Sequence, residues 1–151
     1  MKLVIAEKPS VGNSIARIIG ATRRGDGFTE GNGYIVSWCF GHLVALSSPE
    51  EYDKKYGKPW KLSNLPIIPL EFRWTVLEST APQFEKLRQL MERPDVDELI
   101  CATDAGREGE CVFRYVYNQA GCTKPFRRLW ISSMTDEAIR DGFSNLRPGS
   151  D

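Results

Sequence analysis

Short apolar runs alternate with amphipathic stretches along this chain of 151 residues, and that alternation constrains its possible folds more than any other feature. Apolar and β-branched residues predict strands at 2–6, 34–40, 73–77, 98–103 and 129–131. Apolar residues at helical spacing predict helices at 11–19, 82–92, 108–120 and 136–146. The alternation of strands and helices from residue 73 onward favours βαβ units. The sequence therefore predicts the α/β class, with a largely parallel sheet flanked by helices.

Two stretches interrupt this alternation. Residues 25–33 are rich in glycine and are predicted to form a loop. Residues 47–70 hold four of the nine prolines and are predicted to form an irregular insertion. Residues 146–151 resemble a turn at a domain boundary, so residues 1–151 are predicted to form a single domain of a longer protein.

The composition limits the partners and the compartment. Twenty basic residues balance twenty acidic ones, so nucleic acid or an anionic membrane would have to bind a local patch. No apolar run approaches the ~20 residues of a membrane span, and acidic Glu7 comes too early for a signal peptide. The four cysteines form no C-x-x-C pair, which excludes a zinc ribbon and indicates small buried side chains. We therefore expect a cytoplasmic protein without a membrane partner.

Acidic residues follow two of the predicted strands. Glu7 ends the first strand, Asp104 follows the strand at 98–103, and Glu108 lies four residues further on in the turn that opens a helix. Functional groups gather at the carboxyl ends of strands in open α/β sheets, so these acids form a candidate Mg²⁺ site. The alternative is that they cap the helix N-terminus and pair with Arg107. Three further acids, Asp95, Asp97 and Glu98, precede the strand and are predicted to be solvated at the opposite end.

Two other residues near the predicted strand ends invite a functional interpretation. Lys8 lies between a strand and a helix N-terminus, where free backbone N–H groups favour a phosphate, although a surface lysine is the simpler alternative. His42 is the single histidine, and no nucleophile motif stands near it, which favours a local hydrogen-bonding role. The chain contains no P-loop and no dinucleotide-binding fingerprint.

Four segments of the chain resemble the type IA DNA topoisomerases, and in particular their topoisomerase III branch. They are LVIAEKPSV at residues 3–11, FGHL at 40–43, TDAGREGE at 103–110 and WISSMT at 130–135. The resemblance covers essentially the whole chain, and together the motifs are specific. It implies a Toprim fold, which is a Rossmann-like parallel sheet flanked by helices. It also implies an isomerase of the bacterial cytosol that cuts one DNA strand, holds the 5′ end on a tyrosine, passes another strand and reseals.

The resemblance also implies roles for individual residues. Glu7 matches the acid–base glutamate, expected to move a proton at the 3′ oxygen, and Lys8 matches the lysine that faces the scissile phosphate. Asp104 and Glu108 match ligands of Mg²⁺, and Glu7 is expected to complete the same metal site. Arg107 and Glu110 match the remainder of the acidic motif and are expected to organise its turn. His42, Arg127 and Arg128 are expected to contact single-stranded DNA.

Two departures from the family pattern affect these expectations. Gly106 stands where the family most often has a second aspartate, so we expect weaker metal binding, with water or another acid such as Glu110 or Glu7 filling in. The nucleophilic tyrosine of the family lies in a later domain, and none of the five tyrosines here matches it. The chain is therefore expected to need the other domains of the same protein and to be inactive alone.

Two other functions remain open. Another Toprim enzyme, a primase or a nuclease, would need no tyrosine, although the R-E-G-E and E-K-P-S-V segments argue against it. A DNA-binding or scaffolding domain, its acidic site degraded by Gly106, is the second alternative. The bases that could steer DNA are Lys8, Arg23, Arg24, Lys124, Arg127 and Arg128, and an ordinary mixed-charge surface would contain the same residues.

Overall fold

The computed structural model describes residues 1–150, and its central strand is β1 (Lys2–Ala6). Residues 3–5 of this strand have no exposed surface. On one side β1 pairs in parallel with β4 (Tyr34–Trp38), and on the other side it pairs in parallel with β7 (Glu98–Ala102). A continuous apolar run suits this position, because a parallel strand covered by helices on both faces presents neither face to water.

The main sheet has seven strands within the described residues, in the order β2-β3-β4-β1-β7-β8-β9. The outer ones are β2 (Arg23–Arg24), β3 (Thr29–Gly31), β8 (Phe126–Arg128) and β9 (Arg147–Pro148). β8 lies parallel to β7, whereas β3 and β9 run antiparallel to their inner neighbours and β2 pairs antiparallel with β3. The predicted α/β class with a largely parallel sheet is confirmed.

Two of the predictions for this sheet are wrong in detail. The strand expected at 129–131 lies instead at 126–128, where two arginines conceal the strand signal and carboxylates from neighbouring elements neutralise their charge. The apolar residues after it leave the sheet and pack against the helices. The loop expected at 25–33 includes strand β3, whose sequence Thr-Glu-Gly carries no apolar alternation.

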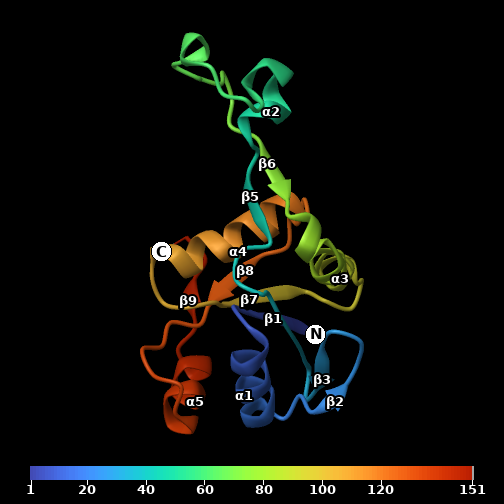
Figure 1. Ribbon diagram of the computed structural model, residues 1–151. Helices are drawn as coiled ribbons and strands as arrows, with labels where there is room; N and C mark the ends of the chain where they lie inside the picture. Colours follow the sequence, from blue (N-terminus) through green and yellow to red (C-terminus); the bar gives the residue numbers. More distant parts are fainter. Residues whose placement is uncertain (151) are drawn as a thin grey trace.

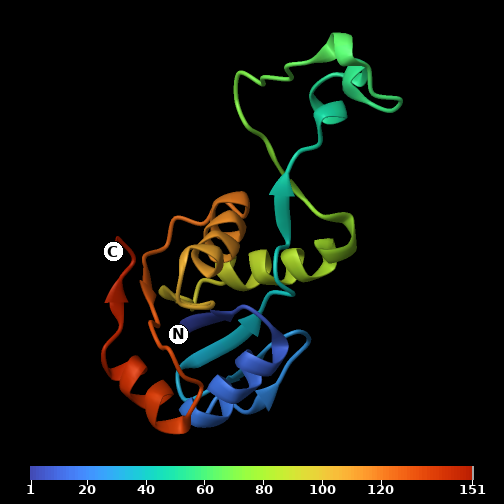
Figure 2. The same ribbon diagram turned by 60° about the vertical axis from the view of Figure 1, so that its left-hand side comes forward.

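Four helices cover the two faces of the sheet, as Figures 1 and 2 show. α1 (Pro9–Ile19) and α5 (Asp136–Ser144) lie on one face, and α3 (Ala81–Glu92) and α4 (Arg107–Gln119) lie on the other. Alternate residues of β1 point into the two cores. The core under α1 and α5 includes Val4, Ile15, Val36, Ile100 and Ile139. The core under α3 and α4 includes Leu3, Ile5, Leu87, Leu99, Phe113 and Val116. No helix within residues 1–150 is long and apolar enough to cross a membrane.

A projecting arm, residues 45–77, rises from the α3–α4 side of the molecule (Figure 1). Its base is a two-stranded antiparallel sheet of β5 (Val44–Leu46) and β6 (Trp74–Val76). The predicted strand at 73–77 therefore exists but lies outside the main sheet, since its partner is β5. Beyond the base, the chain forms only the short helices α2 (Pro49–Tyr52), η1 (Lys54–Tyr56) and η2 (Leu62–Asn64). A further turn, η3 (Glu78–Thr80), leads into α3.

Candidate functional site at the carboxyl edge of the sheet

The parallel strands β1, β4, β7 and β8 end at one edge of the sheet, and the candidate site lies there. Glu7 follows β1, the segment 39–42 follows β4, Asp104 comes two residues after β7, and the segment 129–133 follows β8. Loops at the carboxyl edge of an open parallel sheet are the usual place for a functional site. Residues far apart in the sequence thus meet in space.

One hydrogen bond joins the two acidic motifs directly. The backbone N–H of Asp104 donates to Glu7 Oε2 at 2.9 Å, although the residues are 97 positions apart. The backbone of Glu7 is fixed as well, because its carbonyl oxygen accepts from the N–H of Gly41 at 3.1 Å. The Glu7 side chain is half-buried, and the Asp104 side chain is exposed. The structure therefore holds the Glu7 carboxylate against the turn that presents Asp104.

Two glycines allow the Asp104 turn to be tight. Gly106, the N-cap of α4, has φ 149°, a backbone conformation that residues with a Cβ adopt only with strain. At Gly109, a Cβ would lie 2.0 Å from the Asp104 carbonyl oxygen. The hydroxyl of Thr103 also donates to the Gly109 carbonyl oxygen at 2.7 Å. The backbone conformation at residue 106 therefore favours glycine over aspartate.

The Glu108 carboxylate is held by a histidine rather than by the other acids. Glu108 Oε1 lies 2.6 Å from His42 Nε2, and the Glu108 side chain is 80% exposed. In residues 1–150 no three histidine, cysteine, aspartate or glutamate side chains gather closely enough to enclose a metal ion. The donor set nevertheless fits a hard divalent cation, since Mg²⁺ uses one or two carboxylates and keeps several waters. Asp104 and Glu108 can supply those carboxylates.

Two buried thiols, Cys39 and Cys101, lie near the acidic residues. Cys39, directly after β4, has no exposed surface, and burial together with the nearby Glu7 charge raises the pKa of its thiol to about 12. The pKa of the Cys101 thiol is also raised, chiefly by burial. All four cysteines are free thiols. A thiol that stays neutral beneath Glu7 adds no charge to the acidic cluster.

Lys8 lies beside the acids at the start of α1. It is the N-cap residue of that helix, its side chain is exposed, and Pro9 follows at the first helical position. Within residues 1–150, neither a side-chain cap nor an acid in the first turn competes for the free N–H groups of this helix end. An anion can therefore bind the helix N-terminus and the Lys8 ammonium together.

A cavity of about 540 Å³ adjoins Asp104. Its walls come from α1, from the turn at 103–105 and from the segment 129–134 after β8. Ser132 and Ser133 supply hydroxyl groups to this wall. The sequence predicts a strand at 129–131 and a family resemblance at 130–135, but neither indicates a role for these serines in the site. The sequence signal that could have indicated such a role is the position of the two serines directly after a predicted strand.

Three of the remaining predicted site residues, Glu110, Arg127 and Arg128, lie in ion pairs outside the acidic cluster. Arg128 is only 4% exposed, and its guanidinium donates to both carboxylate oxygens of Glu110 at 2.6 and 2.7 Å. Arg114 also binds Glu110, so this carboxylate is engaged and does not fill the place left by Gly106. Arg127 binds Glu98 at 2.8 Å, towards the opposite end of β7. DNA contact by Arg127 and Arg128 stays a prediction.

The acids expected to be merely solvated are paired as well. Asp95 binds Arg93 at 2.7 Å, and Asp97 binds the N-terminal ammonium at 2.8 Å. The pair of Asp97 with the N-terminal ammonium joins the start of β7 to the start of β1, whereas the Asp95–Arg93 pair lies within one loop. Arg107, expected to organise the turn, is the first residue of α4 and is exposed.

Comparison with known proteins decides the family. The model of the Toprim domain matches residues 2–134. The chain belongs to the Toprim family. DNA topoisomerase 3 of Bacillus thuringiensis is 52% identical over 147 residues, which are 97% of this chain and 20% of that protein. DNA topoisomerase 3 of Shouchella clausii is 51% identical over 148 residues, 98% of this chain and 20% of its own length.

A solved structure agrees with the fold of this Toprim chain. Full-length topoisomerase I from Thermotoga maritima matches with a TM-score of 0.59 and 21% identity, over 97% of this chain and 21% of its own. The resemblance to topoisomerase III and the Toprim fold predicted from the motifs are thereby confirmed. The chain spans about a fifth of the length of the curated relatives it matches.

Proposed function

We propose that this chain is the Toprim part of a type IA DNA topoisomerase of the topoisomerase III kind. In this proposal it supplies the acid–base residue and the metal-binding carboxylates for cleavage and religation of single-stranded DNA. The observation that carries the proposal is the hydrogen bond from the Asp104 N–H to Glu7, which joins both acidic motifs at one edge of the sheet. The identity of 52% to a DNA topoisomerase 3 supports the same conclusion. The reaction would take place in the bacterial cytosol.

Glu7 and Lys8 are the proposed catalytic residues. During cleavage, a tyrosine from another part of the protein attacks the phosphorus, and the bond from phosphorus to the 3′ oxygen breaks. The proton of the tyrosine hydroxyl passes to water. Glu7, in its protonated form, gives a proton to the leaving oxygen and takes it back when the strand is resealed. The Lys8 ammonium, beside the α1 N-terminus, stabilises the negative charge that develops on the phosphate.

Asp104 and Glu108 are the proposed ligands of Mg²⁺, with Glu7 at its border. The resemblance to the type IA topoisomerases implies a divalent metal ion, and two exposed carboxylates with water match the coordination that Mg²⁺ prefers. When bound, the cation would neutralise charge on the phosphate oxygens. His42 holds Glu108 in place through their hydrogen bond. Because Gly106 supplies no third carboxylate, the site is expected to rely on water and on the DNA phosphate.

The first test is a calorimetric titration of Mg²⁺ or Mn²⁺ into this chain. Asp104→Asn and Glu108→Gln should each abolish the binding, because each removes half of the carboxylate set. Asp141→Asn, on the exposed surface of α5, is the matched control and should bind as the parent does. Binding that survives both site variants would contradict the assignment of these two ligands.

The second test uses the full-length protein and its relaxation of supercoiled DNA. Glu7→Gln and Lys8→Ala should each abolish relaxation, while thermal unfolding of the Toprim domain stays unchanged. Near-normal relaxation by either variant would overturn the role given to that residue.

A further inference from the structure

The projecting arm exposes an apolar surface that the catalytic site does not use. Figures 1 and 2 show the arm extending well beyond the helices that cover the sheet. Not one residue from 45 to 80 is buried. The side chain of Leu62 is 87% exposed, that of Ile68 77% and that of Trp60 76%. The other large exposed apolar residues of the arm are Leu46, Leu65, Leu70, Phe72, Trp74 and Leu77. Many large apolar side chains exposed on one projection usually indicate a binding surface.

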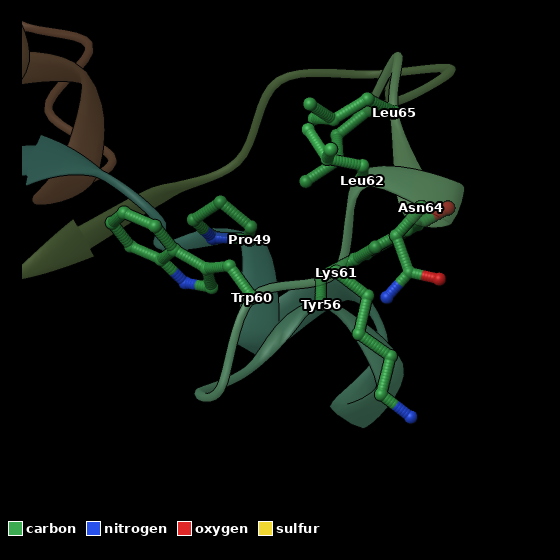
Figure 3. Close-up of a pocket in the computed structure, with 8 residues that line it drawn as sticks. Pro49, Tyr56, Trp60, Lys61, Leu62, Asn64 and Leu65 are labelled. Carbon is green, nitrogen blue, oxygen red and sulfur yellow. The ribbon is translucent and has the colours of Figure 1, made fainter.

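A pre-formed hollow lies on this surface. It has a volume of about 390 Å³, and its walls include Pro49, Trp60, Leu62 and Leu65. Figure 3 shows the Trp60 ring beside Pro49 and the ammonium of Lys61 turned away from both. Residues 62–70 contain no charged side chain. The hollow therefore suits an apolar side chain of a partner.

The arm has an ordered internal structure in spite of this exposure. The N–H of Ser48 donates to Glu51 in a capping box at the start of α2, at 2.6 Å. The N–H of Arg73 donates to the Tyr52 hydroxyl at 2.6 Å, which ties the descending chain to α2. Asn64 donates to the carbonyl oxygen of Lys55 at 2.6 Å. A surface with a fixed shape loses less conformational entropy when a partner binds it.

The charges on the arm favour a protein partner over DNA. Lysines interleaved with aromatics at residues 54–61 could suit a nucleic-acid strand. However, residues 47–73 carry five bases against four acids, and Lys55 is paired with Asp53 at 3.1 Å. Six of the nine large exposed apolar residues of the arm are leucine or isoleucine, which have no ring on which a base could stack. A DNA-binding groove would instead need a clear excess of positive charge.

The root of the arm contacts the candidate site. The Trp74 ring of β6 lies 4.0 Å from the Tyr115 ring of α4, measured between centroids. Tyr115 in turn lies 6.3 Å from the ring of His42, which binds Glu108. A protein domain that binds the arm would thus be connected, through Trp74 and Tyr115, to the elements that carry the acidic cluster.

We propose that the apolar face of the arm docks onto the part of this protein's own polypeptide that lies outside the present chain. The relatives are about five times as long as this chain. The rest of such a polypeptide is large enough to cover the arm. Docking would cover residues 60–72 and would hold the rest of the protein in a fixed orientation to the carboxyl edge. The inference rests on the family relationship and on the exposed arm, and it does not depend on the roles given to Glu7 or Lys8.

Hydrogen exchange of the full-length protein and of the 151-residue chain tests this docking. In the chain alone, amides of residues 60–72 should exchange fast. In the full-length protein they should exchange more slowly by about tenfold or more, because their surface is covered. The triple variant Leu62→Ser, Leu65→Ser, Ile68→Ser should lose that protection. The same changes should leave the melting temperature of the 151-residue chain unchanged, since none of the three side chains is buried.

The matched control is Lys54→Ser, Lys55→Ser, Lys58→Ser on the same arm, which should keep the protection. Equally fast exchange of residues 60–72 in both proteins would overturn the proposal. Protection that requires added single-stranded DNA and disappears in the lysine variant would also overturn it, and would identify the arm as a DNA surface. Protection that grows with protein concentration would overturn it in favour of contact between two copies. Loss of metal binding or of relaxation in the Glu7 or Asp104 variants would leave these results unaffected.

Discussion

Gly109 is the residue on which the geometry of the acidic turn depends most directly. A Cβ at this position would lie 2.0 Å from the Asp104 carbonyl oxygen and 2.7 Å from the Asp104 backbone nitrogen. Relief of this clash would require the backbone of Asp104 to move. Helix propensity alone would favour alanine here by about 1 kcal/mol. The steric conflict is larger, so glycine is required in spite of its poor propensity.

Gly109→Ala should therefore destabilise the fold by about 2 kcal/mol or more, in the range of other overpacking changes. The measurement is urea unfolding of the 151-residue chain. Gly57→Ala is the matched control, because its φ is −72° and its nearest contact would be 3.3 Å, and it should change stability by less than about 0.5 kcal/mol. Unchanged or increased stability of Gly109→Ala would show that the turn can relax around a side chain.

The cysteines near the site should differ sharply in reactivity. Cys39 is fully buried and its thiol has a pKa of about 12, so at pH 8 it is protonated and shielded. Cys111 and Cys122 are half-buried. Iodoacetamide at pH 8 should label the latter two in the native protein and spare Cys39 and Cys101, as read by mass spectrometry. In urea all four should react, and native labelling of Cys39 would mean that the core around this thiol opens.

Single residues of the site were predictable where the signal was local. Glu7 and Asp104 could be identified because each follows an apolar strand in the sequence. The pairing of Glu108 with His42 could not, because 66 residues separate them and no local pattern links the two. The burial of Arg128 beside Glu110 was hidden for the same reason, since adjacent arginines on a short strand usually indicate a solvated surface.

Among the elements, α1 and α5 are joined by an exposed ion pair. Arg17 donates two hydrogen bonds to Asp136, at 2.8 and 3.1 Å. These hydrogen bonds, and then the Arg17 charge, hold the pKa of Asp136 below its ordinary value. A carboxyl with a depressed pKa in the folded state stabilises the fold above its unfolded pKa and loses that contribution as the pH falls through the folded one.

Arg17→Gln should accordingly raise the pKa of Asp136 and lower stability at pH 7. The stability difference from the parent should shrink as the pH falls below about 4, where Asp136 is protonated in the unfolded chain. Urea unfolding between pH 3 and pH 7 measures this difference, and a carboxyl NMR titration follows Asp136 itself. Arg24→Gln, on the exposed edge strand β2, should show no such pH dependence. A parallel pH profile for Arg17→Gln and the parent would contradict the role of the pair.

The elements themselves were predictable to the extent that apolar spacing marked them. The four long helices were found within a few residues, because each has an apolar stripe that faces the sheet. β8 was placed three residues too late, since its charges are neutralised only by tertiary partners. β6 was assigned to the main sheet, because sequence alone does not say that its partner is β5.

For the whole molecule, the chain should bind metal and DNA weakly but should not complete a cleavage reaction alone. Within residues 1–150, none of the residues that form the acidic edge is a tyrosine, and the relatives are about five times as long as this chain. Incubation of this chain with supercoiled DNA and Mg²⁺ should give neither relaxation nor nicking. Nicking without a covalent protein–DNA adduct would instead mark a nuclease. Relaxation by a clean preparation would contradict the view that other domains are required.

The position of β1 has a consequence for how the protein is made. Translation produces β1 before both of its neighbours in the sheet, β4 and β7, and the whole arm is synthesised before the second of them. A nascent chain therefore carries an apolar strand with an unpaired edge until β7 has left the ribosome, and such edges invite aggregation. The Glu7 carboxylate likewise cannot accept its hydrogen bond from the Asp104 N–H until residue 104 has been synthesised. Trigger-factor-type chaperones should accordingly remain bound until synthesis has passed β7, and the acidic edge should form only when the sheet closes around its first strand.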